Sequence, residues 1–312
     1  MERPRPKGRR LRDLRSVPVL PSLITLGNLF FGFLAMAKVT DAVQLGGAES
    51  PAVLASFEFA AILIFVAMVF DAIDGRVARM TGQSTAFGAQ LDSLAEVVTF
   101  GCAPAFLAKV LINLHEGDQS LLPPHPKIYY FCAAVFVLCA AMRLARFNVE
   151  SAGPDEEDHR EFKGLPSPGA AAVVCALIAF FTSRTDQSAI LTRLVLPEHA
   201  QQWTVVAMPG VLVVLGLLMV SKVPFPHVFY LLVQRRHSFP FLATLVVTIG
   251  LVLVEWQLAF VLWTVGYVLF GLGLAIYRYA TRGRLGPPDA GEPELIDSYE
   301  TEAKPYGGGV RN

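Results

Sequence analysis

The feature that most constrains this chain is a series of apolar stretches, each long enough to cross a lipid bilayer. A helix needs about 20 apolar residues to span the hydrocarbon layer. Backbone groups find no partner in lipid, so a spanning segment must be a helix or part of a closed barrel. The stretches lack the alternation of barrel strands, which leaves helices. Eight stretches meet the requirement: residues 20–37, 53–73, 94–113, 128–146, 165–182, 203–220, 238–254 and 257–278.

Composition supports the same fold class, an all-α integral membrane protein with about eight transmembrane helices. Apolar residues make up 54% of the 312 residues and charged residues 17%, whereas soluble domains are about 25% charged. The charges are also segregated, because residues 1–16, 150–163 and 281–312 hold 27 of the 52 charged side chains. The remainder is too apolar for a water-soluble surface. A soluble enzyme, a nucleic-acid-binding protein and a disordered chain are therefore excluded.

The distribution of lysine and arginine predicts the orientation. Of 26 basic residues, 21 fall on one side if the N-terminus is inside. Cytoplasmic segments of membrane proteins carry such an excess. We therefore expect a multi-pass protein of the cell membrane with both termini in the cytoplasm. The segments on that side are residues 1–16, 74–93, 143–164, 221–237 and 278–312.

Four acidic residues stand where the second stretch ends and the third begins. Asp71 and Asp74 are spaced i, i+3, and Asp92 and Glu96 i, i+4, so each pair lies on one helical face. Two antiparallel helices with these faces opposed bring four carboxylates together. Four uncompensated charges near a membrane would be untenable. Divalent cations are the natural remedy, and oxygen ligands favour Mg²⁺, Mn²⁺ or Ca²⁺ over zinc.

Small residues share the faces of these acids. Gly75, Ala78 and Gly88 have almost no side chain, which lets a bulky ligand approach the backbone closely. An alternative is a structural ion-pair network between the first two aspartates and Arg76 and Arg79. That network leaves the small residues unexplained.

The spacing of these residues resembles the signature of the CDP-alcohol phosphotransferase family. The resemblance implies a membrane enzyme that uses two Mg²⁺ or Mn²⁺ ions to transfer a phosphatidyl or related group from a CDP-linked donor to an alcohol, releasing CMP. It also implies a homodimer. The matching pattern is Asp71-x-x-Asp74-Gly75-x-x-Ala78-Arg79, then eight residues, then Gly88-x-x-x-Asp92.

Further segments look like the bacterial phosphatidylserine synthase branch of that family. The resemblance runs from about residue 18 to 225 and implies CDP-diacylglycerol as donor and L-serine as acceptor. Another acceptor, such as glycerol 3-phosphate or inositol phosphate, and an archaeal-type lipid donor remain open. The segments are 21–28, 92–94, 100–104, 143–148, 162–166 and 218–221.

The resemblance assigns roles to residues of this chain. Asp71, Asp74, Asp92 and residue 96 hold the two metal ions. Arg79 contacts the donor phosphates, since a guanidinium fork matches phosphate oxygens. The substrate-binding set for the CDP-linked lipid is Gly75, Ala78, Arg79, Thr85, Gly88 and Asn28.

Two members of that set have equally good structural explanations. Thr85 can serve as a turn or helix-capping hydroxyl. Asn28 can make a hydrogen bond between two helices.

Glu96 departs from the family pattern, which has a fourth aspartate there. The resemblance implies that this residue is the general base that accepts the proton of the acceptor hydroxyl. Glutamate keeps the charge but is one methylene longer. Besides an active enzyme with Glu96 as base, a catalytically impaired membrane protein that retains the fold is therefore an alternative.

Three basic residues are candidates for binding the acceptor or the lipid phosphate. Arg143 and Arg146 are spaced i, i+3 at the cytoplasmic end of the fourth stretch, and Lys163 follows an acidic loop. Membrane anchoring is the alternative for the arginines, and a solvated charge the alternative for the lysine.

The chain divides into four predicted parts. Residues 1–16 form a basic cytoplasmic tail, and residues 17–225 form the membrane domain that carries the resemblance. Residues 226–280 add a transmembrane hairpin with a tight turn, where Glu255 is expected to reach the membrane surface by snorkelling. Residues 281–312, rich in glycine, proline and acids, form a disordered cytoplasmic tail.

Overall fold

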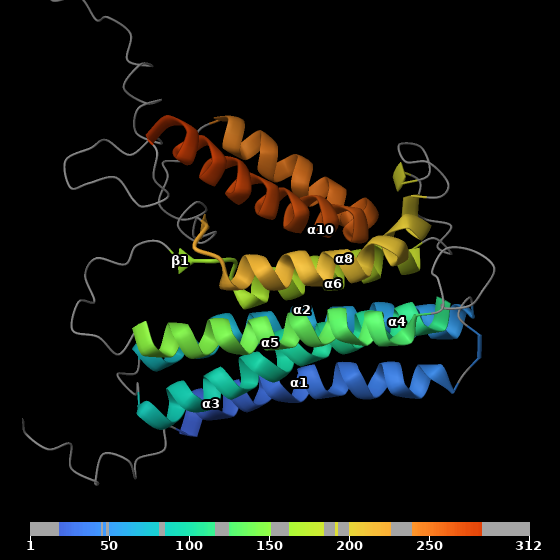
Figure 1. The fold of residues 1–312 in the computed structure, drawn as a ribbon, viewed down its shortest axis with the longest axis horizontal. Coiled ribbons are helices and arrows are strands. Elements are labelled where there is room, and N and C mark those ends of the chain that lie inside the picture. The colour runs from blue at the N-terminus through green and yellow to red at the C-terminus, as the bar shows by residue number, and fades with distance from the viewer. Residues whose placement is uncertain are drawn as a thin grey trace, which may run out of the picture.

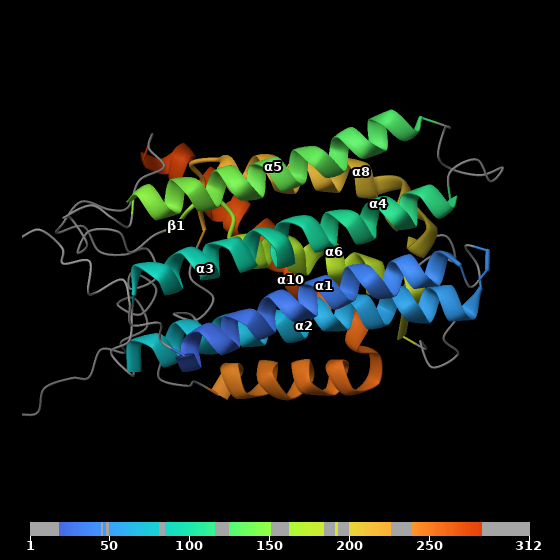
Figure 2. The same ribbon diagram turned by 90° about the horizontal axis from the view of Figure 1, so that it is seen from below.

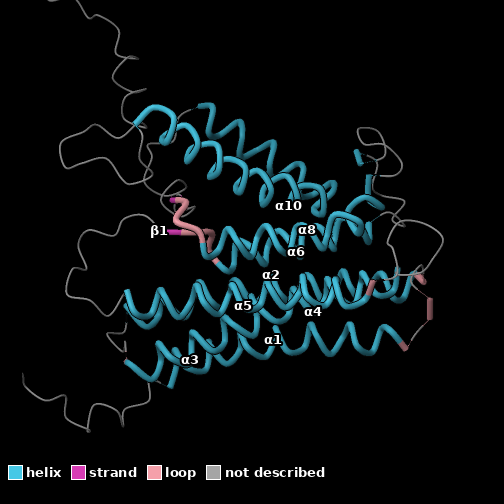
Figure 3. Tube along the Cα trace, viewed as in Figure 1, coloured by secondary structure: helices cyan, strands magenta, loops and turns pink. Residues whose placement is uncertain are grey.

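The chain folds into a bundle of long helices in a computed structural model (Figures 1 and 3). Six described helices are long and apolar enough to cross a membrane. The prediction of an all-helical, multi-pass membrane protein is thereby confirmed, while the count of eight spans and the orientation stay predictions. The structure describes residues 19–44, 46–47, 50–80, 85–115, 125–150, 162–183, 191–192, 200–225 and 239–282.

The helices follow the apolar stretches of the sequence, and several begin where a proline or a cap dictates. Proline is tolerated in the first helical turn because its missing N–H would be unpaired there, which suits the starts of α2, α5 and α6. The helices are α1 (Val19–Val43), α2 (Pro51–Met80), α3 (Ala86–Glu96), α4 (Ala103–His115), α5 (Pro126–Glu150), α6 (Ser167–Thr182), α8 (Ala200–Val220) and α10 (Phe239–Arg282).

A π-helix, η1 (Val97–Cys102), joins α3 to α4, so these three elements form one rod from Ala86 to His115. The third predicted span begins at residue 94, but the rod begins earlier, at Ala86, because Thr85 caps it. The Thr85 hydroxyl accepts a hydrogen bond of 3.1 Å from the backbone N–H of Gly88. The helix therefore extends beyond its apolar part and carries Asp92 with it.

The fifth predicted span, α6, differs from the others. Its 16 residues measure about 24 Å at a helical rise, which is short of the hydrocarbon thickness of about 30 Å. Most of its side chains are buried among the other helices. The apolar residues of α6 therefore contact protein, and composition alone does not distinguish them from apolar residues that face lipid.

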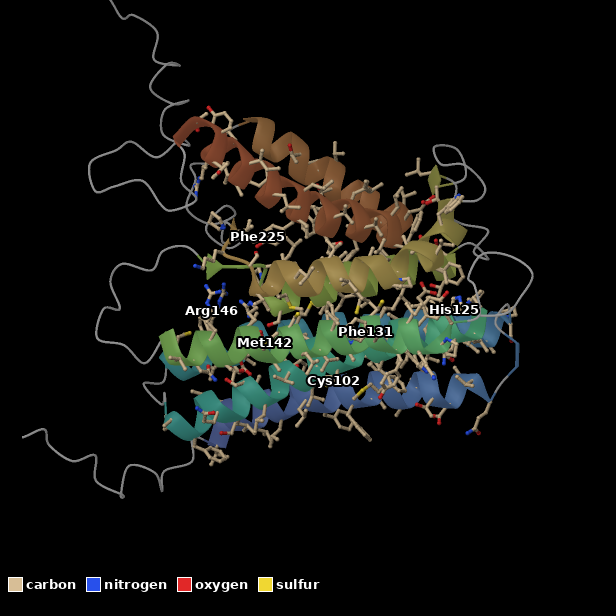
Figure 4. All side chains as sticks on the ribbon, viewed as in Figure 1. Cys102, His125, Phe131, Met142, Arg146 and Phe225 are labelled. Atoms are coloured by element: carbon tan, nitrogen blue, oxygen red, sulfur yellow. The ribbon has the colours of Figure 1, made fainter. Side chains whose placement is uncertain are left out.

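The helix ends that border the predicted cytoplasmic segments gather at one end of the bundle. Figure 1 shows the start of α3 and the ends of α2 and α5 at the end where β1 (Phe162–Lys163) lies. β1 pairs antiparallel with β2 (Pro224–Phe225), with Phe162 opposite Phe225. Figure 4 labels Arg146 near this end and His125 at the opposite end. The helices of successive predicted spans therefore run in opposite directions, as expected for consecutive membrane spans.

The two arms of α10 meet at Glu255, whose backbone is not helical (φ −146°, ψ 82°). The arms spread apart from this point (Figure 2), in contrast to the tight hairpin expected. The second arm packs on the bundle, with the Phe65 and Phe260 rings edge to face at 4.7 Å.

The prediction that Glu255 snorkels to the membrane surface is wrong. Its side chain is only 3% exposed, and its carboxylate accepts hydrogen bonds from the backbone N–H groups of Leu191 and Thr192. The Thr192 hydroxyl donates a further bond of 2.6 Å. Because the break in α10 turns the carboxylate inward, the charge is satisfied by protein donors.

Helix α1 approaches η1 very closely at Gly32. The backbone of Thr99 lies against this glycine, and the Thr99 hydroxyl donates a hydrogen bond of 3.3 Å to the carbonyl of Asn28. Small residues permit such contact between membrane helices. This contact sets the separation between α1 and the rod that carries Asp92.

Gly32→Ala is expected to lower the thermal unfolding midpoint of the detergent-purified protein. A Cβ at Gly32 would lie 2.5 Å from the Thr99 Oγ1 and 2.9 Å from its Cα, and overpacking of this kind costs about 1–3 kcal/mol. Gly250→Ala is the matched control, because nothing lies within 4 Å of a Cβ there. Differential scanning fluorimetry compares the two, and equal midpoints would contradict the tight contact.

Candidate active site

Three aspartates converge at the end of the bundle where α2 ends and α3 begins. Carboxylate oxygens of Asp71, Asp74 and Asp92 all lie within 4.8 Å of one another. Asp71 stands 20 residues after Pro51, a helical length of about 30 Å, which equals the hydrocarbon thickness. The cluster therefore lies where the spanning part of α2 ends.

Helix α1 supplies a partner for the first of these acids. The amide Nδ2 of Asn28 donates a hydrogen bond of 3.1 Å to Oδ1 of Asp71. Asn28 is fully buried. The alternative role of Asn28, a hydrogen bond between two helices, is therefore present, and this bond orients Asp71 toward the cluster.

The other two aspartates have oxygens that a cation would satisfy. Oδ2 of Asp74 and Oδ1 of Asp92 are buried and accept no hydrogen bond from the part of the chain that the structure describes. Asp74 is 4% exposed. Buried carboxylate oxygens without donors are costly, and hard oxygen ligands are those that Mg²⁺ and Mn²⁺ prefer. The three residues thus fit a divalent metal ion.

The structural ion-pair network stays an alternative for Asp71 and Asp74. Asp71 accepts a hydrogen bond from Asn28, Asp74 is buried, and Arg76 is exposed. The side chain of Arg79 lies outside the described part.

Glu96 lies beside the three aspartates but makes a different contact. Its carboxylate is close enough to Asp71 and Asp92 for the negative charges to repel one another. Its Oε2 accepts a hydrogen bond of 3.0 Å from the hydroxyl of Ser167, the first residue of α6. That hydroxyl in turn accepts a bond of 3.0 Å from Nη1 of Arg143 on α5. The role of Glu96 as metal ligand and base stays a prediction.

The π-helix begins directly after Glu96. Such wide turns inside α-helices are frequent at functional sites. Here η1 separates α3, which bears Asp92, from α4, which packs in the core, where Leu107 is fully buried.

A second contact holds the same part of the rod against α5. The Asn148 Nδ2 donates a hydrogen bond of 2.8 Å to the Ser93 hydroxyl. The acidic end of α3 is thus fixed on both sides, by α1 and by α5.

The predicted acceptor residues occupy three different settings. Arg143 is 8% exposed and bonded within the protein, which is not the exposed setting that membrane anchoring requires. Arg146 donates a hydrogen bond of 3.4 Å to the carbonyl of Val220. Lys163 has its backbone in β1, and its side chain lies outside the described part.

Apart from Asn28, the residues predicted to bind the CDP-linked lipid lie near the end of α2 and the start of α3. A Cβ on Gly75 would meet nothing within 4 Å, so open space adjoins the helix there. Thr85 and Gly88 form the helix cap, the alternative kept for Thr85. Ala78 and Arg79 belong to the last turns of α2, but their side chains are outside the described part.

Ser167 was not predicted. It stands between two prolines at the start of an apolar stretch, a setting typical of a helix start. Its link to Glu96 and Arg143 depends on how α6 packs against α3 and α5.

Comparison with known proteins gives a consistent result. The family model described as CDP-alcohol phosphatidyltransferase matches residues 18–215. A CDP-diacylglycerol–serine O-phosphatidyltransferase of Helicobacter pylori is 28% identical over 215 residues, which are 67% of this chain and 72% of the relative. One of Bacillus subtilis is 30% identical over 67% of this chain and 90% of the relative. An archaetidylserine synthase of Methanothermobacter thermautotrophicus is 32% identical over 52% of this chain and 59% of the relative.

Mn²⁺ is expected to raise the unfolding midpoint of the purified protein, because an ion that binds only the folded state stabilises it. Asp71→Asn and Asp92→Asn should each remove this rise, since a neutral amide is a poor ligand for a hard cation. Asp41→Asn, at an exposed aspartate near the end of α1, is the matched control. Titration followed by fluorimetry and by Mn²⁺ electron paramagnetic resonance measures binding. Binding that survives both cluster variants would contradict the site.

Proposed function

Because the chain belongs to the CDP-alcohol phosphatidyltransferase family, we propose that it transfers a phosphatidyl group from CDP-diacylglycerol to L-serine, yielding phosphatidylserine and CMP. The observation that carries the proposal is the convergence of Asp71, Asp74 and Asp92. Two of these residues, Asp74 and Asp92, have a buried oxygen without a hydrogen-bond donor among the described residues, which a cation would satisfy.

Serine as the acceptor is supported by the relatives. Those from Helicobacter pylori and Bacillus subtilis are named for serine. A buried arginine beside Glu96 is also suited to a substrate that carries a carboxylate, since guanidinium and carboxylate pair through two parallel bonds. Glycerol 3-phosphate and inositol phosphate are the competing acceptors. Similarity to an archaetidylserine synthase favours an archaeal-type lipid as the competing donor.

Two divalent ions, Mg²⁺ or Mn²⁺, held by Asp71, Asp74, Asp92 and Glu96, would neutralise the charge of the donor pyrophosphate and of the departing CMP. The chain's own residues position the groups around them. Asn28 holds Asp71 by its amide.

On the nucleotide side, Arg79 binds the donor phosphates. Gly75, Ala78 and Gly88 leave room for cytidine, and Thr85 supports this part of the site by capping α3.

On the acceptor side, Glu96 takes the proton of the serine hydroxyl as the hydroxyl oxygen attacks the phosphorus. A general base must lie within hydrogen-bond reach of that proton. Arg143 orients the serine carboxylate, and Arg146 and Lys163 are the residues proposed to bind the lipid phosphate.

We place this site at the cytoplasmic face of the cell membrane, in a homodimer. The excess of basic residues on the same side of the chain supports the orientation. There the donor's headgroup meets water-soluble serine, and CMP leaves into the cytoplasm.

Purified protein in mixed micelles is expected to release CMP from CDP-diacylglycerol with serine at least about tenfold faster than with glycerol 3-phosphate or inositol phosphate, because a site built for one polar acceptor leaves groups unpaired with another. A chelator should abolish the release. An archaeal-type CDP-lipid donor serves as the parallel substrate. Preference for another acceptor would overturn the serine assignment, and no release with any alcohol would indicate the impaired protein.

Glu96→Gln is expected to lower serine-dependent CMP release by about a hundredfold or more, since an amide cannot accept the proton. Glu58→Gln is the matched control, because Glu58 accepts a hydrogen bond from Gln257 away from the cluster. Glu96→Asp tests the length of the side chain: a lower rate indicates a site adapted to glutamate. Near-normal release by Glu96→Gln would exclude Glu96 as the base.

A further inference from the structure

We propose that Ser167 is a positioning residue that adapts the site to a glutamate at position 96. Its hydroxyl fixes the Glu96 carboxylate and links it to Arg143. This inference rests on the proposed function, in which Glu96 is the base. The geometry of the three residues gives Ser167 a direct contact to that base.

The direction of the hydrogen bonds follows from the chemistry of the groups. An arginine has only donors and an ionised carboxylate only acceptors, whereas a hydroxyl has one proton and two lone pairs. Arg143 Nη1 lies 3.0 Å from the Ser167 Oγ, and Glu96 Oε2 lies 3.0 Å from the same atom. The serine must therefore accept from Arg143 and donate to Glu96, which fixes both partners at once.

The backbone before Ser167 is held by α8 and by the segment that joins α8 to β2. The Gly164 N–H donates a bond of 2.8 Å to the carbonyl of Val223, and the Leu165 N–H donates one of 3.0 Å to that of Leu218. Gly164 has φ +94°, and a Cβ there would run into the carbonyl of Met219. Glycine is needed at such a position.

The start of α6 is also supported from the other side, by the second arm of α10. A Cβ on Gly169 would lie 3.5 Å from Cε1 of Tyr267, and the Tyr267 and Phe225 rings are 6.0 Å apart. Ser167 is 2% exposed. Its place is therefore set by backbone and aromatic packing that do not involve Glu96.

The fixed hydroxyl matters because of the length of glutamate. Glutamate has one more rotatable bond than aspartate, and its carboxylate loses more rotamer freedom when it is ordered. Misplacement of a catalytic group by about 1 Å can cost about a hundredfold in rate. An aspartate at 96 would end about one C–C bond, about 1.5 Å, short of Ser167. The hydrogen bond to Ser167 is therefore one that a glutamate at position 96 can make and an aspartate cannot.

A double-mutant cycle of Ser167→Ala with Glu96→Asp tests this inference in the full chain in mixed micelles. CMP release is followed with the acceptor that the wild type uses fastest. Ser167→Ala is expected to lower kcat about tenfold, as for loss of a hydrogen bond to a charged group. The acceptor KM should change less than about twofold. Ser167→Thr, which keeps the hydroxyl, should restore most of kcat.

In the Glu96→Asp background, Ser167→Ala is expected to change kcat less than about twofold, because the bond is already absent. Ser183→Ala is the matched control, since Ser183 is a buried serine just beyond the other end of α6 and bonds to the carbonyl of Phe180. An equal loss in both backgrounds, a rise in acceptor KM alone, or the same loss in Ser183→Ala would overturn the role of Ser167. Poor activity with serine but normal activity with another acceptor would overturn only the proposed substrate.

Discussion

The structure depends on one electrostatic constraint: several carboxylates are gathered at the end of a membrane span. Negative charges so close together repel one another, and burial removes the water that would screen them. The contacts around these carboxylates offset the repulsion in different ways. Asp71 receives an amide donor from α1, and Glu96 a hydroxyl from α6. One buried oxygen each of Asp74 and Asp92 accepts no hydrogen bond from the described residues, and a cation would satisfy these two atoms.

Close helix packing makes these contacts possible. Gly32 lets α1 lie against the backbone of Thr99 in η1, and the same helix donates the Asn28 amide to Asp71 on α2. The π-helix follows Glu96 directly, and the bond between Asn148 and Ser93 holds the same rod against α5. In a membrane, where apolar residues gain little by leaving lipid, such small-residue contacts and hydrogen bonds between helices are the main source of specific association.

The sequence predicted the features that depend on local patterns. Apolarity is local, so the long helices could be recognised, and helical periodicity placed Asp71 and Asp74 on one face. The short, enclosed α6 could not be distinguished from a span, because an apolar residue facing protein looks the same as one facing lipid. Ser167 could not be found either, since its partners at residues 96 and 143 are distant in sequence and meet only through packing. Glu255 was misjudged for the same reason: its donors at residues 191–192 are 63 or 64 positions away.

The bond between Glu255 and Thr192 also has a consequence for the order in which the chain assembles. A ribosome makes residues 191–192 before Glu255, so the donors precede the acid in synthesis. The bond joins two other contacts that anchor the second arm of α10 near its apex: Gln257 donates to Glu58, and the Phe260 ring packs on Phe65. This arm carries Tyr267, which packs against the start of α6. The support of Ser167 by Tyr267 therefore depends on a residue made 100 positions later in the chain.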